Sequence, residues 1–272
     1  MNTRSIPEPD KTHYRTIFLS DIHLGTKGCQ ADRLASFLKQ HSCDQLYLVG
    51  DIIDGWRMKS SGIYWPQSHV NVIRRVLTMT KRGTEVIYVT GNHDEFLRDH
   101  SPLEFGNLKV VDEAEHRSAD GRTYWVVHGD QFDVVTRYHR WLAWLGDVGY
   151  TILLEVNRLM NRLRTRFGYG YWSLSAWLKH RVKQAVNYIG DYEDALARQC
   201  HKQGNDGVIC GHIHHAEISN FDGVTYMNCG DWVESCTALV EDAQGRFKNI
   251  DRSQAEAQIP TVIPFEEERL SA

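Results

Sequence analysis

Five short clusters of aspartate, asparagine and histidine contain the side chains that could hold metal ions or move protons. They are Asp21-Ile22-His23, Gly50-Asp51-Ile52-Ile53-Asp54, Gly91-Asn92-His93-Asp94, His128-Gly129-Asp130 and Gly211-His212-Ile213-His214. Together the clusters offer carboxylate, amide and imidazole groups and no thiolate. That mixture suits a pair of divalent ions such as Mn, Fe or Zn rather than a structural zinc built from cysteines.

The spacing inside two clusters predicts that their side chains share a direction. Residues i and i+2 of an extended strand lie on one face, so Asp21 with His23, and His212 with His214, are expected to point into the same site. Glycines that permit tight turns and a close approach of the backbone come directly before three of the candidate ligands, Asp51, Asn92 and His212.

Buried strands are expected to position the first three clusters. Short apolar runs at 16–20, 45–50 and 85–90 each end at a cluster, and the stretches 31–41 and 67–82 between them have helical spacing. This alternation is typical of βαβ units, in which ligands bind beyond the carboxyl ends of parallel strands. The second helix is expected to carry an apolar face with Val70, Ile73, Val76 and Leu77.

Later apolar runs predict a second sheet. The runs at 123–127, 207–210, 224–227 and 236–240 lie closer together and are expected to be paired or antiparallel strands. The whole pattern predicts an α/β (α+β) fold, a four-layer αββα sandwich of two mixed sheets flanked by helices. We expect a single domain over 1–272 with a polar tail at 251–272.

The segment 134–190 differs from the rest of the chain. It holds nine lysines and arginines against two acidic residues, and four of the eight tryptophans. Its apolar residues have helical spacing, which predicts a helical insertion. One interpretation is a cap that packs on the sheet with its charges in solvent. The other is a lid that faces an anionic membrane, and the two are compatible.

Composition excludes several other classes of protein. With 42% hydrophobic and 24% charged residues, the chain is typical of a soluble globular protein, and its net charge of −4 does not favour a general nucleic-acid binder. The polar N-terminus has no apolar core of a secretory signal, and no run of 18 apolar residues occurs. The six cysteines form no CxxC pair, so we expect free thiols and a cytoplasmic location.

The ordered pattern D-x-H, G-D-x-x-D, G-N-H-D, H-G-D and G-H-x-H resembles the calcineurin-like metallophosphoesterase superfamily. All five blocks occur in order between Asp21 and His214, over about 70% of the chain. The resemblance implies two divalent ions, most simply Mn, and a phosphoester hydrolase in which a hydroxide formed on the ions attacks phosphorus without a covalent nucleophile.

The resemblance also implies a role for each residue. One ion would be held by Asp21, His23, Asp51 and His214. The other would be held by Asp51, Asn92, His128 and His212, with Asp51 as the bridge. His93 would lie near the leaving group as a proton donor or a stabiliser of phosphoryl charge, with Asp94 orienting it. Asp54 and Asp130 would orient metal ligands, and a solvated or capping role is the alternative for each.

Within the superfamily the sequence looks most like the UDP-2,3-diacylglucosamine pyrophosphohydrolases of lipid A synthesis, which also carry a helical insertion before the last block. This likeness implies cleavage to UMP and a lipid-linked sugar 1-phosphate, at the inner face of the cytoplasmic membrane. Those enzymes typically have arginine after the asparagine of the third block, where this chain has His93. Substrate contacts by Trp56, Arg137 and Arg140 rest only on their closeness to a metal-ligand block.

Two alternatives remain open at the level of sequence. The same chemistry could act on a soluble nucleotide, a cyclic nucleotide or a phosphoprotein. A fold retained as a non-catalytic scaffold is the alternative from another class, although such relatives usually lose a ligand or the histidine at position 93, and this chain has them all.

Overall fold

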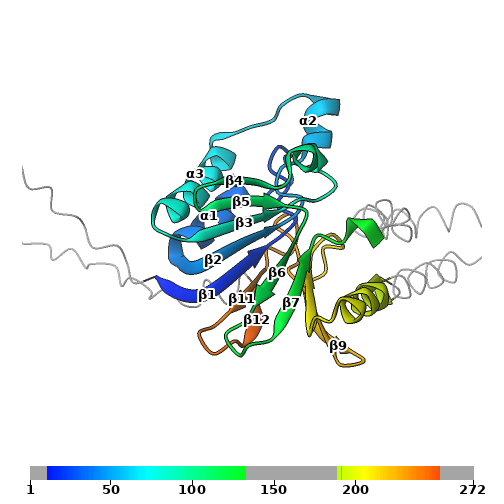
Figure 1. Ribbon diagram of the computed structural model, residues 1–272. Coiled ribbons are helices and arrows are strands. Elements are labelled where there is room, and N and C mark those ends of the chain that lie inside the picture. Colours follow the sequence, from blue (N-terminus) through cyan, green and yellow to red (C-terminus); the bar gives the residue numbers. More distant parts are fainter. Residues whose placement is uncertain (1–10, 133–188, 191, 252–272) are drawn as a thin grey trace, which may run out of the picture.

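The computed structural model describes residues 11–132, 189–190 and 192–251. Two mixed β-sheets pack face to face, with helices on the outside (Figure 1). The predicted four-layer αββα arrangement is therefore confirmed for the described part of the chain. Most of the predicted insertion at 134–190 and of the tail at 251–272 lies outside the described residues.

The first sheet has seven strands in the order β12-β11-β1-β2-β3-β5-β4. Its strands are β1 (Thr12–Leu19), β2 (His41–Val49), β3 (Glu85–Val89), β4 (Leu103–Phe105), β5 (Leu108–Val111), β11 (Ala238–Glu241) and β12 (Phe247–Ile250). The four strands β1, β2, β3 and β5 are mutually parallel, and the others pair antiparallel. The carboxyl ends of β1, β2 and β3 therefore meet at one edge.

The second sheet has five strands in the order β6-β7-β8-β10-β9. They are β6 (Glu113–Arg117), β7 (Thr123–Val127), β8 (Gly207–Cys210), β9 (Glu217–Phe221) and β10 (Val224–Asn228). Of the later runs expected to be paired or antiparallel strands, β7, β8 and β10 are paired but run parallel. The last run, 236–240, overlaps β11, which belongs to the first sheet and pairs antiparallel there. β9 lies at the edge of the sheet and pairs antiparallel with β10, the strand that follows it in the chain.

Helices cover the outer faces of both sheets. Helices α1 (Ala31–Gln40) and α3 (Gln67–Lys81) pack on the first sheet, α2 (Gly55–Ser61) and the 3-10 helix η1 (Glu95–His100) follow the strand ends, and a helix at 192–203 packs on the second sheet (Figure 1). α3 buries His69, Val72, Val76 and Met79. The buried face therefore differs from the expected one. Of Val70, Ile73, Val76 and Leu77, only Val76 is buried, and Leu77 is 54% exposed.

Three apolar layers hold the elements together. The layer between the sheets includes Phe18, Val89, Val126, Ile209 and Leu239, all of them buried. Because strands from both sheets contribute to this layer, it fixes the two carboxyl edges side by side. Within the described ranges, no helix has the length and apolarity needed to cross a membrane.

Candidate metal centre

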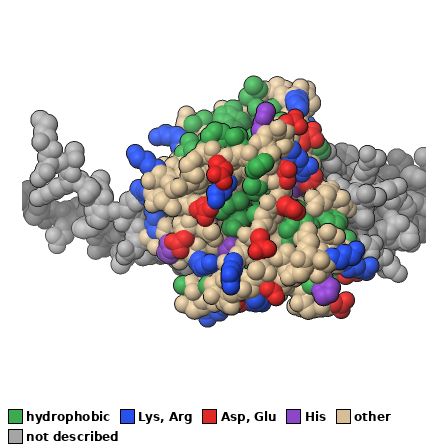
Figure 2. Space-filling model, in the orientation of Figure 1, with side chains coloured by type: hydrophobic (Ala, Val, Ile, Leu, Met, Phe, Trp, Pro, Cys, Tyr) green, Lys and Arg blue, Asp and Glu red, His purple; other side chains and the backbone are tan. Residues whose placement is uncertain are grey.

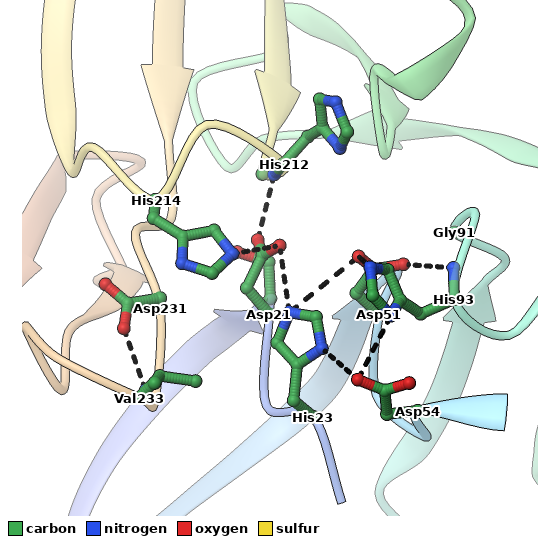
Figure 3. Close-up of polar contacts among 12 residues, drawn as sticks. Asp21, His23, Asp51, Asp54, Gly91, His93, His212, His214, Asp231 and Val233 are labelled. Atoms are coloured by element: carbon green, nitrogen blue, oxygen red, sulfur yellow. Dashed lines mark hydrogen bonds and ion pairs between the residues drawn. The ribbon is translucent and has the colours of Figure 1, made fainter. Parts of the chain in front are cut away.

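The five predicted clusters lie together where strands of the two sheets end. Figure 3 shows members of the first, second, third and fifth clusters. β1, β2 and β3 lead into the first three clusters, and β7 and β8 lead into the last two. The centre is thus built from segments up to about 190 residues apart in sequence, as in the bond from the His212 backbone N–H to Oδ2 of Asp21 at 2.9 Å. We describe it as two neighbouring groups of possible ligands with Asp51 between them.

The first group contains Asp21, His23 and His214, whose ligand atoms lie within 4.8 Å of one another. Nε2 of His214 is 3.2 Å from Oδ1 of Asp21, and Nε2 of His23 is 3.9 Å from the same oxygen. Nδ1 of His23 donates to Oδ2 of Asp54 at 3.3 Å, which leaves Nε2 free to face the group.

The second group contains Asp51, His128 and His212, again with ligand atoms within 4.8 Å. Nε2 of His128 lies 3.4 Å from Oδ1 of Asp51 and 3.3 Å from Nδ1 of His212. Nδ1 of His128 donates to the carbonyl of Val49 at 3.0 Å, so its Nε2 is the nitrogen that faces the group.

Asp51 faces both groups. Its Oδ1 lies toward His128, while its Oδ2 is 3.8 Å from Nε2 of His23 in the first group. This is the position expected of a residue that bridges two ions. The third cluster joins it through the backbone N–H of His93, which donates to Oδ1 of Asp51 at 2.8 Å.

The donor set fits divalent cations because several ligand atoms have no other partner. Within the described residues, Oδ1 of Asp21, Nε2 of His23 and Oδ1 of Asn92 are buried and make no hydrogen bond. An unsatisfied buried polar atom costs about 1–3 kcal/mol. Divalent ions bound to these atoms would supply the missing interactions, and hard or borderline ions prefer such oxygen and imidazole ligands.

The backbone of the ligands is not extended, contrary to the expectation for Asp21-x-His23 and His212-x-His214. Positive φ angles occur at Asp21 (50°), His23 (54°), Asp51 (54°), His212 (72°) and His214 (54°). Such conformations cost of order 1–3 kcal/mol each in residues with a side chain, and they concentrate at functional sites. Bonds between the loops hold them, as in the bond from the His23 N–H to the carbonyl of Asp51 at 2.9 Å.

Two glycines show the close approach expected from the sequence. A Cβ on Gly91 would lie 2.3 Å from Oδ1 of Asp51, and one on Gly211 would lie 2.5 Å from Oδ2 of Asp21. Both distances are far inside van der Waals contact, so any side chain would displace a ligand carboxylate. The glycines therefore leave the space that these two carboxylates occupy.

Charges in the centre shift the pKa values of its members. Burial opposes ionisation of Asp21, but His214 lowers the pKa of this carboxyl to about 2. Burial also disfavours the charged rings, yet Asp51 raises the pKa of His128 to about 10 and Asp21 raises that of His214 to about 9. Without an ion, the two rings thus hold protons that balance the carboxylates at neutral pH.

His93 lies at the edge of the centre beside Asp54 and Trp56. Its Nδ1 is 3.1 Å from Oδ2 of Asp54, and its Nε2 is 3.8 Å from Oδ2 of Asp51. The indole of Trp56 lies 4.3 Å from the imidazole, centroid to centroid, and the Gly55 N–H donates to the His93 carbonyl at 2.9 Å. The ring is 14% exposed, so a ligand in the centre can reach it.

Asp94 does not orient His93, contrary to the sequence expectation. Its buried carboxylate accepts hydrogen bonds from the Tyr88 hydroxyl at 2.6 Å, from the Ile52 N–H at 2.9 Å and from the Gly91 N–H. Burial, and then the charge of Asp51, raises the pKa of Asp94. Asp94 therefore joins the loops after β2 and β3, and Asp54 takes the place beside the ring of His93.

The other expected orienting residues have separate partners. Asp54 uses its second oxygen to cap α2, accepting from the Arg57 N–H at 2.7 Å. Both oxygens of Asp130 lie 2.9 Å from Nη2 of Arg98 on η1. Asp130 thus attaches η1 to the loop that carries His128, and Arg137 and Arg140 lie outside the described residues.

Sequence reasoning missed Asp231, which lies beside His214 (Figure 3). Its charge contributes to the raised pKa of His214, and its carboxylate accepts from the Val233 N–H at 2.8 Å and the Ser235 hydroxyl at 2.5 Å. The backbone N–H of the next residue, Trp232, donates to the carbonyl of Asp21 at 3.0 Å. The dipeptide Gly230-Asp231 directly after β10 repeats the pattern of Gly50-Asp51 and was available as a signal.

The chain is similar to known proteins in sequence and in fold. Residues 14–216 match the family described as calcineurin-like phosphoesterase. A UDP-2,3-diacylglucosamine hydrolase of Neisseria meningitidis serogroup B is 27% identical over 223 residues, which cover 79% of this chain and 88% of that protein. One from Shewanella halifaxensis is 22% identical over 240 residues, covering 83% and 93%. The crystal structure of a hypothetical protein from Pyrococcus horikoshii matches with a TM-score of 0.47 at 10% identity, covering 88% of both chains.

Proposed function

The chain belongs to the calcineurin-like phosphoesterase family and is a metal-dependent phosphoester hydrolase, and from this premise we propose that it hydrolyses UDP-2,3-diacylglucosamine. The products would be UMP and a lipid-linked sugar 1-phosphate. The observation that carries the chemistry is the pair of ligand groups described above, each with its ligand atoms within 4.8 Å of one another.

Each metal ligand keeps the role expected from the family pattern. Asp21, His23 and His214 would hold one ion and Asn92, His128 and His212 the other, with Asp51 shared by both. The family fold implies two divalent ions, and we propose Mn as the native metal. When bound, such ions lower the pKa of a coordinated water and neutralise charge on the phosphoryl oxygens.

The protein residues around the ions would govern proton transfer and orientation. Hydrolysis forms a bond from water oxygen to phosphorus and breaks the bond to the leaving oxygen, which must gain a proton. His93 is placed to give that proton from Nε2, because its Nδ1 lies against the Asp54 carboxylate. Trp56 packs against the same ring and restricts its rotation.

The choice of substrate rests on two further features. Curated relatives that match most of this chain are hydrolases of UDP-2,3-diacylglucosamine by name. The segment 134–190, outside the described residues, combines nine cationic side chains with four tryptophans. We propose that it caps the site and contacts an anionic membrane, so that the enzyme acts at the inner face of the cytoplasmic membrane.

A second candidate is the same hydrolysis on a soluble nucleotide, cyclic nucleotide or phosphoprotein. The residue after Asn92 favours it, because the lipid A hydrolases resembled by the sequence typically have arginine where this chain has His93. A non-catalytic scaffold is not favoured, since every ligand of both groups is present.

One experiment separates these candidates. The full chain with added Mn is incubated with UDP-2,3-diacylglucosamine in detergent micelles and, separately, with bis(p-nitrophenyl) phosphate and cyclic nucleotides. Release of UMP, abolished by Asp51→Asn, supports the proposal. Turnover of the soluble esters without release of UMP would support the second candidate. If no substrate is hydrolysed with Mn, Fe or Zn, the non-catalytic scaffold is the remaining interpretation. Sedimentation with anionic vesicles, comparing wild type with the Arg158/Arg162/Arg166→Glu triple variant, tests the insertion.

A further inference from the structure

A short exposed segment borders the metal centre and contains an unusual set of side chains. It begins directly after Asp54, runs through α2, and ends where α3 begins at Gln67. Seven large hydrophobic side chains are exposed in the described part of the chain: Trp56, Ile63, Tyr64, Leu77, Phe96, Phe105 and Ile218. Three of them belong to this segment, and the ring of Phe96 packs over Gly55 at its start.

Exposure is greatest at the turn between α2 and α3. Ile63 is 74% exposed and Tyr64 41% exposed. Figure 2 shows hydrophobic side chains at the upper edge of the molecule, over the segment that joins α2 and α3, with cationic side chains next to them. We call Trp56, Arg57, Lys59, Ile63 and Tyr64 the α2 rim.

The charge of the α2 rim is opposite to that of the whole protein. Arg57 and Lys59 are exposed, and residues 55–66 contain no aspartate or glutamate, although the chain carries a net charge of −4. The ammonium group of Lys27 lies 5.8 Å from the centre of the Tyr64 ring and adds a third cation. Two carboxylates contact the rim: Asp54 accepts from the Arg57 backbone N–H at 2.7 Å, and Glu95 accepts from Nε1 of Trp56 at 3.1 Å.

This combination fits the surface of an anionic membrane better than it fits a protein partner. Exposed aliphatic and aromatic side chains insert at the boundary of headgroups and acyl chains, and nearby lysines and arginines bind anionic headgroups. A protein interface needs about 800 Å² on each partner around an apolar centre, which a seven-residue helix and its loop are too small to provide.

We infer that the α2 rim docks this enzyme on an anionic lipid surface. The inference rests on the proposed function for the amphiphilic nature of the substrate, but it concerns residues that hold no metal and that lie outside the basic insertion. The position of the rim relates this membrane contact to the metal centre. Asp54, which caps α2, also contacts His23 and His93, so the helix that leads to Ile63 and Tyr64 begins at the border of the catalytic cluster.

The test measures sedimentation of the full chain with vesicles of phosphatidylcholine alone and of phosphatidylcholine with 30 mol% phosphatidylglycerol. The Ile63→Ser/Tyr64→Ser variant should lower the partition coefficient on the anionic vesicles by about tenfold, since two apolar groups no longer insert. Arg57→Gln/Lys59→Gln should remove most of the preference for the anionic vesicles. Leu77→Ser and Phe105→Ser, exposed by 54% and 64% away from the rim, are matched controls and should change partition less than twofold.

Turnover of bis(p-nitrophenyl) phosphate reports whether the centre is intact, because this ester is soluble. Rim variants that retain this turnover but partition like wild type would overturn the inference. If light scattering finds a dimer for wild type and a monomer for the rim variants, the inference is also overturned, because a second copy of the chain would then cover the rim. Failure to release UMP from micellar substrate, in contrast, would reject the proposed substrate and leave the vesicle result standing.

Discussion

Oδ2 of Asp54 lies 3.1 Å from Nδ1 of His93, which makes this carboxylate the partner of the ring that we propose as the proton donor. The same oxygen lies 3.3 Å from Nδ1 of His23, a candidate metal ligand. One side chain thus sets the orientation of both rings. A carboxylate behind a histidine fixes its tautomer and makes its other nitrogen available.

Loss of the Asp54 carboxylate should slow turnover without emptying the centre. In Asp54→Asn, kcat should fall about 10–100-fold, because the amide holds the ring of His93 less firmly. In His93→Ala, kcat should fall further, by about 10²–10⁴-fold, and both metal ions should remain bound. Turnover of an ester with a poor leaving group, together with metal analysis of the purified variants, measures these effects.

The double variant tests whether the two residues act together. If Asp54 works through His93, adding Asp54→Asn to His93→Ala should cost little beyond the single change. Multiplied losses in the double variant would show that Asp54 has an independent role. If His93→Ala lost metal, the ring would be a ligand rather than a proton donor.

Asp51→Ala should remove both ions, because its two oxygens face the two groups separately. Oδ1 is 3.4 Å from Nε2 of His128 and Oδ2 is 3.8 Å from Nε2 of His23. Metal analysis after dialysis should find both equivalents lost, whereas the exposed Asp44→Ala is the matched control and should keep them. Retention of one equivalent in Asp51→Ala would mean that this residue belongs to one ion only.

Metal affinity should rise with pH across the neutral range. Asp51 and Asp21 raise the pKa values of His128 and His214 to about 10 and about 9 in the metal-free protein, so each ring is protonated at pH 7. An ion must displace these protons, and the affinity should therefore increase about tenfold per pH unit for each proton released. Titration calorimetry with Mn between pH 6 and pH 8 measures the slope.

A variant of His214 distinguishes the contributions of the His128 and His214 rings to this pH dependence. His214→Gln removes one titrating group, so the slope of affinity against pH should fall by about one proton for the ion that His214 would hold and stay unchanged for the other. An affinity for Mn that does not change between pH 6 and pH 8 would show that both rings are already neutral in the metal-free chain.

Residue types and strand ends were sufficient to predict which side chains meet. Asp21, Asp51 and Asn92 follow apolar runs whose ends must lie at one edge of a parallel sheet, so their convergence follows from topology. The backbone at these positions was not predictable from alternation. The expected extended geometry of Asp21 and His23 is replaced by positive φ angles, because bonds between the loops determine the conformation there.

Partnerships between side chains depend on tertiary contacts that spacing does not encode. Adjacency suggested that Asp94 orients His93, but Asp94 is buried and bonds to Tyr88 and to two backbone N–H groups. Asp54, from the preceding cluster, takes that position instead. The buried face of α3 differed for a similar reason, since the sheet and α1 select Val72 and Met79 rather than Leu77.

Glu241 joins the two sheets through a buried carboxylate, and its removal should destabilise the fold. It accepts hydrogen bonds from Arg15 and Thr16 on β1 at 2.8 Å and from His116 on β6 at 2.9 Å. Although burial opposes ionisation, these bonds lower the pKa of Glu241. Glu241→Gln should therefore lose about 2 kcal/mol of unfolding free energy at pH 7, a value reduced for the partial exposure of Arg15.

The pH dependence distinguishes this bond network from simple packing. A carboxyl with a lowered folded pKa contributes stability above its unfolded pKa, near 4.3, and loses it as pH falls through the folded value. The difference between wild type and Glu241→Gln in urea unfolding should thus be full at pH 7 and shrink below about pH 4. Glu85→Gln is the matched control, because Glu85 also has a lowered pKa but pairs with Lys109 at the surface, so it should cost less than about 0.5 kcal/mol. A difference for Glu241→Gln that stays constant from pH 7 to pH 3 would mean that the shape of the side chain, rather than its charge, joins the sheets.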